Sequence, residues 1–276
     1  MRVAAINDLS GFGKCSLMAD ISVLTSMGIA VCPVPTAVLT SQTGFPSHYM
    51  HNTNDMVEQS RKEWKKRGET FDGILTGFVP GEKVLDDVQA FSEAFKTEKT
   101  ILLVDPVMGD NGRSYSFYSD EMLQKMKKLV AIADIITPNL TELCLLAEES
   151  PKAVIEDVEK TGDLQLICNL AGKVKNNDNM CVVVTGVTIS EYEISNIIVF
   201  NKGCHVVKNR HNGHSYSGTG DLFAAVLMGN ILQGRDIVEA VSSTAEFILK
   251  SVEATSATDR NYGVDYEKIL AERGLI

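Results

Sequence analysis

Short apolar runs alternate with longer segments of mixed polarity along most of the chain. The run at residues 101–104 has no polar position, which is typical of a parallel strand covered by helices on both faces. Apolar or β-rich runs of this kind predict strands at residues 3–6, 29–34, 73–76, 101–104, 135–136 and 182–184. Two further β-rich runs within residues 194–207 flank Asn201-Lys202-Gly203, which predicts a hairpin turn.

Segments with apolar residues at helical spacing lie between the predicted strands. We expect helices at residues 16–27, 54–67, 82–96, 140–147, 222–233 and 237–252, one that ends near residue 131, a long helical stretch that runs to about residue 175, and a last helix from residue 265. This alternation predicts an α/β fold: a doubly wound, mostly parallel sheet flanked by helices, with an antiparallel hairpin at one edge. The 276 residues contain no linker or repeat, so we expect a single domain over residues 1–276.

The predicted helix at residues 222–233 has almost no polar face, so it should lie inside the protein with only its first turn open to a cleft. Ser217-Gly218-Thr219-Gly220-Asp221 leads into it. Unpaired N–H groups at a helix start attract anions, and glycine lets a phosphate approach the backbone closely. Asp221 would be repelled by that phosphate unless it takes a proton from the group that attacks it. The alternative is a turn in which Asp221 only caps the helix.

Ligands of such sheets bind at the carboxyl ends of the strands, so residues at the predicted strand exits are candidate site residues. These exits are rich in acids, amides and threonines. The residues at the exits are Asn7, Asp8, residues 36–43, Gly77, Asp105, Thr137, Asn139, Thr185 and Gly186. Oxygen ligands of this kind suit hard cations such as Mg²⁺ and K⁺, and hydroxyl or amide groups suit phosphate. The pattern therefore indicates a cation and phosphate site at one edge of the sheet.

A formal net charge of −10 argues against a nucleic-acid partner or an anionic membrane surface, because the basic clusters are short. The six cysteines show no CxxC pair and several lie in apolar runs, so we expect buried thiols in a reducing compartment. No apolar run approaches the length of a membrane span, and the N-terminus does not resemble a signal peptide. We therefore expect a soluble, cytoplasmic protein that acts on a small molecule.

Two other patterns resemble binding motifs but lack residues that those motifs need. Gly11-Phe12-Gly13-Lys14-Cys15-Ser16 has neither the first glycine nor the Mg²⁺-binding hydroxyl residue of a phosphate-binding loop, so we expect a loop that borders a substrate pocket. His48 with His51, and His211 with His214, have no nearby acid or cysteine to complete a metal shell. We expect these histidines to be loop residues.

An ordered set of five motifs spans nearly the whole chain. It consists of Ser41-Gln42-Thr43-Gly44-Phe45, Asp105-Pro106-Val107-Met108-Gly109-Asp110, Thr137-Pro138-Asn139-Leu140-Thr141-Glu142, Val184-Thr185-Gly186 and Gly218-Thr219-Gly220-Asp221-Leu222-Phe223. Through this set the chain resembles the ribokinase-like superfamily and, within it, the vitamin B6 kinases, pyridoxal kinase and its relatives. The resemblance implies a ribokinase-like fold, ATP as phosphoryl donor, Mg²⁺, K⁺ at a monovalent site, and a homodimer.

The same resemblance implies a role for each site residue. Asp221 would be the catalytic base that faces the substrate hydroxymethyl group, and Gly218, Thr219 and Gly220 would form the anion hole. The remaining roles fall to four sets: Asp105, Asp110, Asn139 and Glu142 for Mg²⁺; Asp105, Thr137 and Thr185 for a monovalent cation; Thr185, Gly186 and Asn139 for the nucleotide; and Asp8, Ser10, Thr43 and Asp221 for the substrate. Many pyridoxal kinases have a serine where Asp8 stands.

From these roles we expect ATP-dependent phosphorylation of the 5′-hydroxymethyl group of a vitamin B6 vitamer: pyridoxal, pyridoxine or pyridoxamine. Phosphoryl transfer needs positioning and charge stabilisation more than covalent chemistry, and a glycine anion hole, cations and one carboxylate supply these. One alternative is a hydroxymethylpyrimidine kinase of the same fold. Another is a catalytically silent nucleotide-binding regulator, against which the presence of Asp221 argues.

Overall fold

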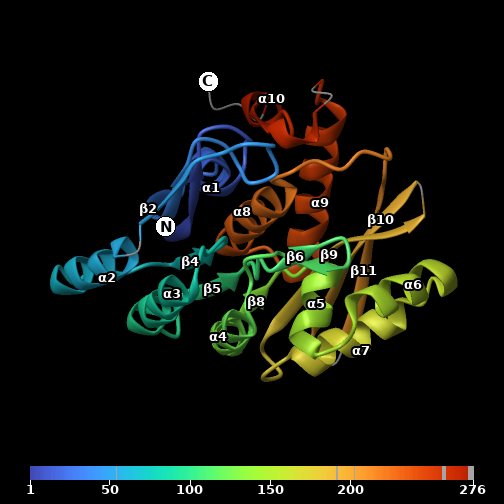
Figure 1. The fold of residues 1–276 in the computed structure, drawn as a ribbon, viewed down its shortest axis with the longest axis horizontal. Helices are drawn as coiled ribbons and strands as arrows, with labels where there is room; N and C mark the ends of the chain where they lie inside the picture. The colour runs from blue at the N-terminus through green and yellow to red at the C-terminus, as the bar shows by residue number, and fades with distance from the viewer. Residues whose placement is uncertain (54, 191, 202, 257–258, 273–276) are drawn as a thin grey trace.

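Strands from both halves of the chain join one sheet in the computed structural model, which describes residues 1–53, 55–190, 192–201, 203–256 and 259–272 (Figure 1). The strands are β1 (Arg2–Ser10), β2 (Ala30–Leu39), β3 (Met50–Asn52), β4 (Gly73–Thr76), β5 (Ile101–Val104), β8 (Ile135–Ile136), β9 (Cys181–Ser190), β10 (Glu193–Phe200) and β11 (Gly203–Arg210). Their order is β11-β10-β9-β8-β5-β4-β1-β2-β3. The six central strands are parallel, and antiparallel strands lie at both edges.

Helices cover both faces of the sheet (Figure 1). One layer consists of α1 (Ser16–Ser26), α8 (Thr219–Leu232), α9 (Ile237–Glu253) and α10 (Tyr266–Glu272). The other consists of α2 (Met56–Lys66), α3 (Glu82–Phe95), α4 (Asp120–Ala131), α5 (Leu140–Ala147), α6 (Pro151–Thr161) and α7 (Leu164–Val174). The expected doubly wound α/β fold is confirmed. Within the described residues, no helix combines the length and the apolar character that crossing a membrane requires.

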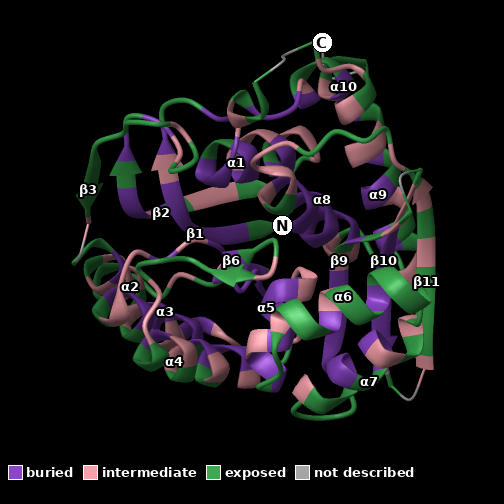
Figure 2. Cartoon of the chain, turned by 45° about the vertical axis from the view of Figure 1, so that its right-hand side comes forward, coloured by how far each residue is buried: buried purple, intermediate pink, exposed green. Residues whose placement is uncertain are grey.

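Two apolar cores form because successive side chains of a strand point to opposite faces of the sheet. In β5, Leu102 and Val104 pack against the layer of α2 to α7, whereas Leu103 packs against the layer that contains α1 and α8. Figure 2 shows the central strands buried and the outward faces of the helices exposed. The unbroken apolar run at residues 101–104 therefore supplies both cores at once.

Three strands extend beyond the apolar runs that predicted them. β9 continues to Ser190, so the expectation that this strand stops at Thr185-Gly186 is wrong. Antiparallel pairing with β10 sustains the strand, and Gly186 takes a positive φ of 67° where the register shifts. β1 and β2 also extend further, to Ser10 and Leu39. The first part of residues 36–43, which we expected at the site, therefore belongs to the sheet.

The segments between strands differ from the expectation at two points. The long helical stretch expected up to about residue 175 is two helices, because Gly162 takes a φ of 66° that ends α6 before α7 begins. The connection between β5 and α4 contains a small hairpin, β6 (Gly109–Asp110) with β7 (Arg113–Ser114). The β10–β11 hairpin is confirmed, although Lys202 of its predicted turn lies outside the described residues.

The cysteines are not all thiols, which corrects the sequence-based expectation. Cys168 of α7 and Cys204 of β11 form a disulfide bond. The free cysteines are Cys15, Cys32, Cys144 and Cys181. The bond joins a helix to an edge strand across a separation of 36 residues, so only the packed fold brings its two ends together.

Candidate active site

Four neighbouring parallel strands place one residue each in a single row at the carboxyl edge of the sheet. The final pairs between β1, β4, β5 and β8 are in register, so the residues that come next lie side by side. The row runs Asn7, Gly77, Asp105, Thr137. All four are predicted strand-exit residues, and the sheet brings them together.

The first turn of α8 lies over this row. Gly218 is the N-cap of the helix, and Asp221 follows in its first turn. Asn7 Nδ2 donates a hydrogen bond to Asp221 Oδ1 at 3.0 Å. A Cβ added at Gly220 would lie 3.8 Å from Asp105 Oδ2. The glycines of the predicted anion hole, the predicted base and a predicted cation ligand therefore meet at one point of the sheet edge.

Position 218 requires glycine. Gly218 adopts a φ of 81°, in the left-handed region that other residues rarely enter. A Cβ there would lie 2.7 Å from Cys15 Cβ, because the helix start sits directly on the residues before α1. The Thr219 hydroxyl donates to Tyr216 O at 3.1 Å and so holds the turn. The first N–H groups of α8, including those of Thr219 and Gly220, have no partner within the helix and can bind an anion.

Asp221 is not the cap of α8, because Gly218 holds the N-cap position and the Asp221 carboxylate accepts from Asn7. Burial and then the charge of Asp8 raise the pKa of Asp221 to about 6, although hydrogen bonds from Asn7 and from the backbone of Ser16 oppose the rise. A carboxylate with this pKa is ionised at neutral pH and is more basic than an exposed one. These are the properties of a general base.

Asp105 and Thr137 form a buried pair across β5 and β8. Thr137 Oγ1 donates to Asp105 Oδ1 at 3.0 Å. Burial and then the charge of Asp221 raise the pKa of Asp105 to about 7, while the Thr137 hydroxyl opposes the rise. Because two acids lie close together away from water, a bound cation would lower the free energy of this arrangement.

Asn139 and Glu142 form the capping box of α5. Glu142 N donates to Asn139 Oδ1 at 3.0 Å, and Asn139 N donates to Glu142 Oε2 at 2.8 Å. The same two side chains fasten the helix to the β6 hairpin: Met108 N donates to Glu142 Oε1 at 3.1 Å, and Asn139 Nδ2 donates to Gly109 O at 2.8 Å. Burial, followed by the charge of Asp105, raises the pKa of Glu142 well above its ordinary value. Both side chains therefore carry structural hydrogen bonds in addition to any role toward Mg²⁺.

Asp110 lies exposed on the β6 hairpin, where its two oxygens accept from Asn111 N and Asn111 Nδ2, each at 2.8 Å. In the part of the chain that the structure describes, no three His, Cys, Asp or Glu side chains are grouped so that they could hold a metal ion alone. Mg²⁺ commonly keeps several waters and binds through one or two carboxylates and the substrate phosphates. The scattered set of Asp105, Asp110 and Glu142 fits a Mg²⁺ that binds together with phosphates.

Thr185 and Gly186 lie within β9, next to the start of α5. Thr185 N donates to Pro138 O at 2.9 Å, and a parallel bridge joins Thr185 to Asn139. A Cβ added at Gly186 would meet no atom within 4 Å beyond its chain neighbours, so open space adjoins it. The predicted nucleotide-binding residues therefore form one continuous part of the sheet edge.

The predicted substrate residues are brought together only in part. Asp8 and Ser10 are buried at the end of β1, and Ser10 Oγ donates to Asp8 Oδ2 at 2.8 Å. Burial raises the pKa of Asp8, although hydrogen bonds from Ser16 and Ser10 oppose the rise. Thr43 is exposed on the loop after β2, which runs beside residues 11–12.

An aromatic hollow beside this loop was not predicted. It has a volume of about 300 Å³ and is lined by Phe12, Thr40, Ser41, Phe45 and Tyr262. The Tyr262 ring packs edge-on against Phe45, with ring centres 5.1 Å apart, and against Phe12 at 6.4 Å. Tyr262 comes from the short helix η1 (Arg260–Tyr262) near the C-terminus. Only tertiary packing brings these rings together, so no local pattern could reveal the hollow.

Lys14 is engaged by the C-terminal segment. Its Nζ forms ion pairs with Asp265 Oδ1 at 2.7 Å and with Glu267 Oε2 at 2.9 Å. A lysine of a phosphate-binding loop would instead extend toward a phosphate. The structure therefore agrees with the rejection of such a loop at residues 11–16.

Asp20 of α1 is a site residue that the sequence analysis missed. It is 1% exposed, and Asn7 Nδ2 donates to its Oδ2 at 3.2 Å. Burial, followed by the charge of Asp221, raises the pKa of Asp20 well above its ordinary value. One signal was present in the sequence: helical spacing places this lone acid on the same buried side as Leu17 and Leu24.

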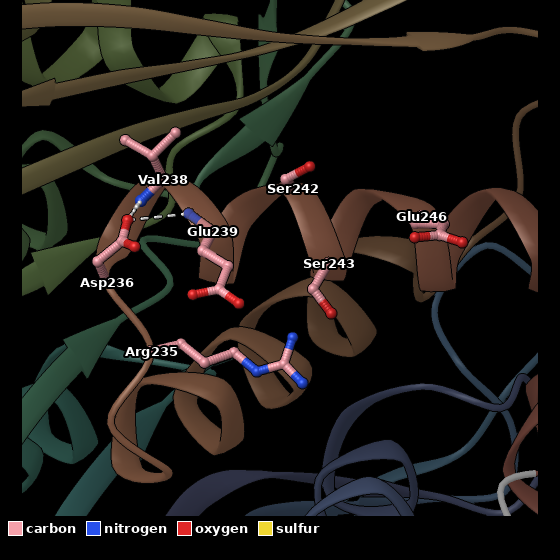
Figure 3. A pocket seen from close by; sticks show the side chains of 7 residues that line it. All are labelled: Arg235, Asp236, Val238, Glu239, Ser242, Ser243 and Glu246. Carbon is pink, nitrogen blue, oxygen red and sulfur yellow. Dashed lines mark hydrogen bonds between the residues drawn. The ribbon is translucent and has the colours of Figure 1, made fainter.

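A larger hollow of about 550 Å³ lies beside the first half of α9, far from these residues (Figure 3). It is lined by Arg235, Asp236, Val238, Glu239, Ser242, Ser243 and Glu246. Asp236 is the N-cap of α9 and accepts from Val238 N and Glu239 N. The hollow adjoins the C-terminal end of α8, a 14-residue helix that is about 20 Å long at 1.5 Å per residue. It therefore lies at the opposite end of that helix from Asp221.

Comparison with known proteins agrees with this geometry. The family model described as phosphomethylpyrimidine kinase matches residues 12–265. Pyridoxal kinase PdxY of Corynebacterium diphtheriae is 28% identical over 277 residues, which cover 94% of this chain and 91% of that protein. A hydroxymethylpyrimidine/phosphomethylpyrimidine kinase of Staphylococcus aureus is 25% identical over 268 residues, which cover 95% of this chain and 92% of that protein.

Solved structures extend the comparison. A candidate phosphomethylpyrimidine kinase from Bacteroides thetaiotaomicron, crystallised with pyridoxal, is 32% identical with a TM-score of 0.90 and covers 98% of this chain and 94% of its own. Pyridoxal kinase from Lactobacillus plantarum has a TM-score of 0.87 at 24% identity, covers 98% of this chain and 95% of its own, and supports the fold alone. The family match spans the row of strand-exit residues from Gly77 onward and the start of α8. The chain therefore belongs to the phosphomethylpyrimidine kinase family and is a phosphotransferase with an alcohol group as acceptor.

Proposed function

We propose that the protein transfers the γ-phosphoryl group of ATP to the 5′-hydroxymethyl group of a vitamin B6 vitamer. The observation that carries the proposal is the position of Asp221. Its carboxylate is held by Asn7 in the first turn of a buried helix, directly after glycines whose N–H groups can bind a phosphoryl group. A proton acceptor and an anion site therefore lie next to each other, as transfer to a hydroxyl group requires.

In this proposal, Asp221 accepts the hydroxyl proton as the substrate oxygen attacks the γ-phosphorus. A new O–P bond forms, the bond between the γ-phosphorus and the bridging oxygen breaks, and ADP leaves. The N–H groups of Gly218, Thr219 and Gly220 face the negative charge on the transferring group. With a pKa of about 6, Asp221 is mostly ionised at neutral pH and ready to accept the proton.

Cations complete the charge balance. The residues that would hold Mg²⁺ are Asp105, Asp110, Asn139 and Glu142, and those that would hold a monovalent cation are Asp105, Thr137 and Thr185. Bound Mg²⁺ would neutralise part of the phosphate charge. Without a cation, the buried acids beside Gly220 would repel the nucleotide. Thr185, Gly186 and Asn139 border the nucleotide in this arrangement.

The acceptor ring lies against Asp8, Ser10 and Thr43 in this proposal. A relative that is 32% identical was crystallised with pyridoxal, which favours a B6 vitamer. The family description and the Staphylococcus aureus relative name pyrimidine substrates, so hydroxymethylpyrimidine is the second candidate. Both molecules present a hydroxymethyl group on a heteroaromatic ring, and the same base would serve either one.

A substrate panel tests the proposal. The purified protein is given ATP and Mg²⁺ with pyridoxal, pyridoxine, pyridoxamine or hydroxymethylpyrimidine, and both ADP and the phosphorylated product are measured. We expect the highest kcat/KM with a B6 vitamer. A higher kcat/KM with hydroxymethylpyrimidine would favour the second candidate. ADP formation no greater than in the absence of acceptor, with all four compounds, would reject both.

A further inference from the structure

The orientation of the buried Asn7 amide is fixed by four hydrogen bonds. Oδ1 accepts from the backbone N–H groups of Phe78 at 2.8 Å and Asp8 at 3.0 Å. Because a backbone N–H can only donate, the oxygen must face these groups and Nδ2 must face the other way. Nδ2 donates to Asp221 Oδ1 at 3.0 Å and to Asp20 Oδ2 at 3.2 Å. Each of the two amide hydrogens therefore has its own carboxyl group.

Gly77 makes room for this amide. A Cβ added at Gly77 would lie 2.5 Å from Asn7 Cγ and 2.6 Å from Asn7 Oδ1, closer than packed atoms approach. Gly77 has no positive φ, so the requirement for glycine is steric rather than conformational. Any larger residue at this strand exit would push the amide out of the row.

Asp20 provides a second anchor for the Asn7 amide, because its Oδ2 accepts from Asn7 Nδ2. Its carboxyl group is buried in α1, and burial, followed by the charge of Asp221, raises its pKa well above the ordinary value, which favours the protonated form. In its protonated form this carboxyl group still accepts the second amide hydrogen and adds no negative charge beside Asp221. Hydrogen bonds to Oδ1 and from Nδ2 thus fix the orientation of the Asn7 amide.

We infer that Asn7, seated over Gly77 and anchored by Asp20, is a positioning residue that aims the Asp221 carboxylate at the acceptor hydroxyl. The inference rests on the proposed role of Asp221 as the base. The hydrogen bond from Asn7 holds Oδ1 and so restricts the rotation of the Asp221 carboxylate. Misplacing a reacting group by about 1 Å can lower a rate by about 100-fold, so the loss of this contact should be visible in kcat.

The first test compares Asn7→Ala and Gly77→Ala with a matched control, Asn230→Ala. Asn230 is an equally buried amide of α8 that donates to residues of α9 instead. We expect kcat to fall by about 10- to 100-fold in the first two variants, with KM for ATP within about twofold. Asp20→Ala should lie between Asn7→Ala and the wild type. Asn230→Ala should lower thermal stability and leave kcat unchanged. An equal loss of kcat in the control would overturn the inference, because the effect would then be general damage to the core.

A double-mutant cycle distinguishes aiming from any other effect. Asp221→Asn has no base to aim, so adding Asn7→Ala to it should change the residual kcat by less than about twofold. Losses that multiply would overturn the inference. If Asp221→Asn alone keeps wild-type turnover, the proposed function fails. If Asp221→Asn is slow but Asn7→Ala turns over like the wild type, only the positioning role fails.

Discussion

The acids of the candidate site differ in what each can do, because burial perturbs them to different extents. Burial raises the pKa of Asp221 to about 6 and that of Asp105 to about 7, and it raises the pKa of Asp20 well above its ordinary value. Of Asp221 and Asp105, Asp221 loses its proton at the lower pH, and it lies in the first turn of α8. Environments that separate the pKa values of neighbouring acids assign them different chemical roles.

We predict that kcat/KM for the acceptor rises with pH through an apparent pKa near 6. The reason is that Asp221 must lose its own proton before it can accept one from the substrate. Initial rates between about pH 5 and pH 8, at constant ionic strength and saturating Mg²⁺ and ATP, measure this pKa. The residual rate of Asp221→Asn should lack the dependence. A wild-type rate that does not vary over this interval would contradict the assignment.

Asp221 could be found from the sequence because its chemistry depends on neighbours in the chain. The glycines before it and the apolar helix after it are local features. Asp20 could not be assigned in the same way, because its partner Asn7 reaches it only when α1 packs on β1. The aromatic hollow was missed for the same reason, since Tyr262 meets Phe12 only in the folded chain.

At the scale of elements, the apolar pattern predicted the buried central strands but not where they end. The prediction stopped β9 at Thr185-Gly186, whereas pairing with β10 carries it onward. β3 was not predicted, because its three residues are all exposed and give no alternation between a buried and an exposed face. The register of the parallel strands, which no sequence pattern specifies, then aligns Asn7, Gly77, Asp105 and Thr137.

Oxygen ligands at adjoining strand ends lead us to predict that the enzyme prefers K⁺ to Na⁺. Asp105, Thr137 and Thr185 offer oxygen ligands at the ends of β5 and β8 and within β9, so we expect higher turnover in KCl than in NaCl at equal ionic strength. Thr137→Val, which removes one oxygen and keeps the shape, should reduce the difference. Equal rates of the wild type in the two salts would remove the monovalent site from the account.

The disulfide bond between α7 and β11 should contribute to stability rather than to turnover. It closes a loop with a separation of 36 residues, for which a contribution of about 2–4 kcal/mol is expected. Cys204→Ser should lower the free energy of unfolding by about that amount and leave kcat unchanged. Urea denaturation without reductant measures the difference, and Cys32→Ser, which alters a free cysteine, is the control with an expected cost of about 1 kcal/mol or less. Equal stability of Cys204→Ser and the wild type would contradict the contribution.

At the scale of the whole molecule, the fold buries a group of acids between the strand exits and the start of α8. The chain has a formal net charge of −10, so this local charge adds to an overall excess of acid. Repulsion among these buried acids lowers the free energy of unfolding at neutral pH, and bound cations would raise it again.

The expected homodimer stays a prediction that light scattering would test.

We predict that the free energy of unfolding decreases as the pH rises from about 5 to 8. A carboxyl group whose pKa is higher in the folded state stabilises the fold while it is protonated, and that stability is lost as the pH rises through the folded-state pKa, about 6 for Asp221 and about 7 for Asp105. Added Mg²⁺ should therefore stabilise the protein more at pH 8 than at pH 5. Urea denaturation at both values measures this, with Asp105→Asn expected to show a weaker dependence. Stability that increases across the interval would contradict the account.

The central claim is that Asp221 acts as a base in phosphoryl transfer, and turnover by Asp221→Asn tests it most directly. The substitution keeps the shape of the side chain and leaves the N–H groups of Gly218 to Gly220 in place, so ATP affinity measured by calorimetry should stay level or rise slightly. Turnover should fall by roughly 10²–10⁴-fold, the usual contribution of general-base assistance. Slow turnover with intact ATP binding is the predicted result, and wild-type turnover by Asp221→Asn would contradict the mechanism.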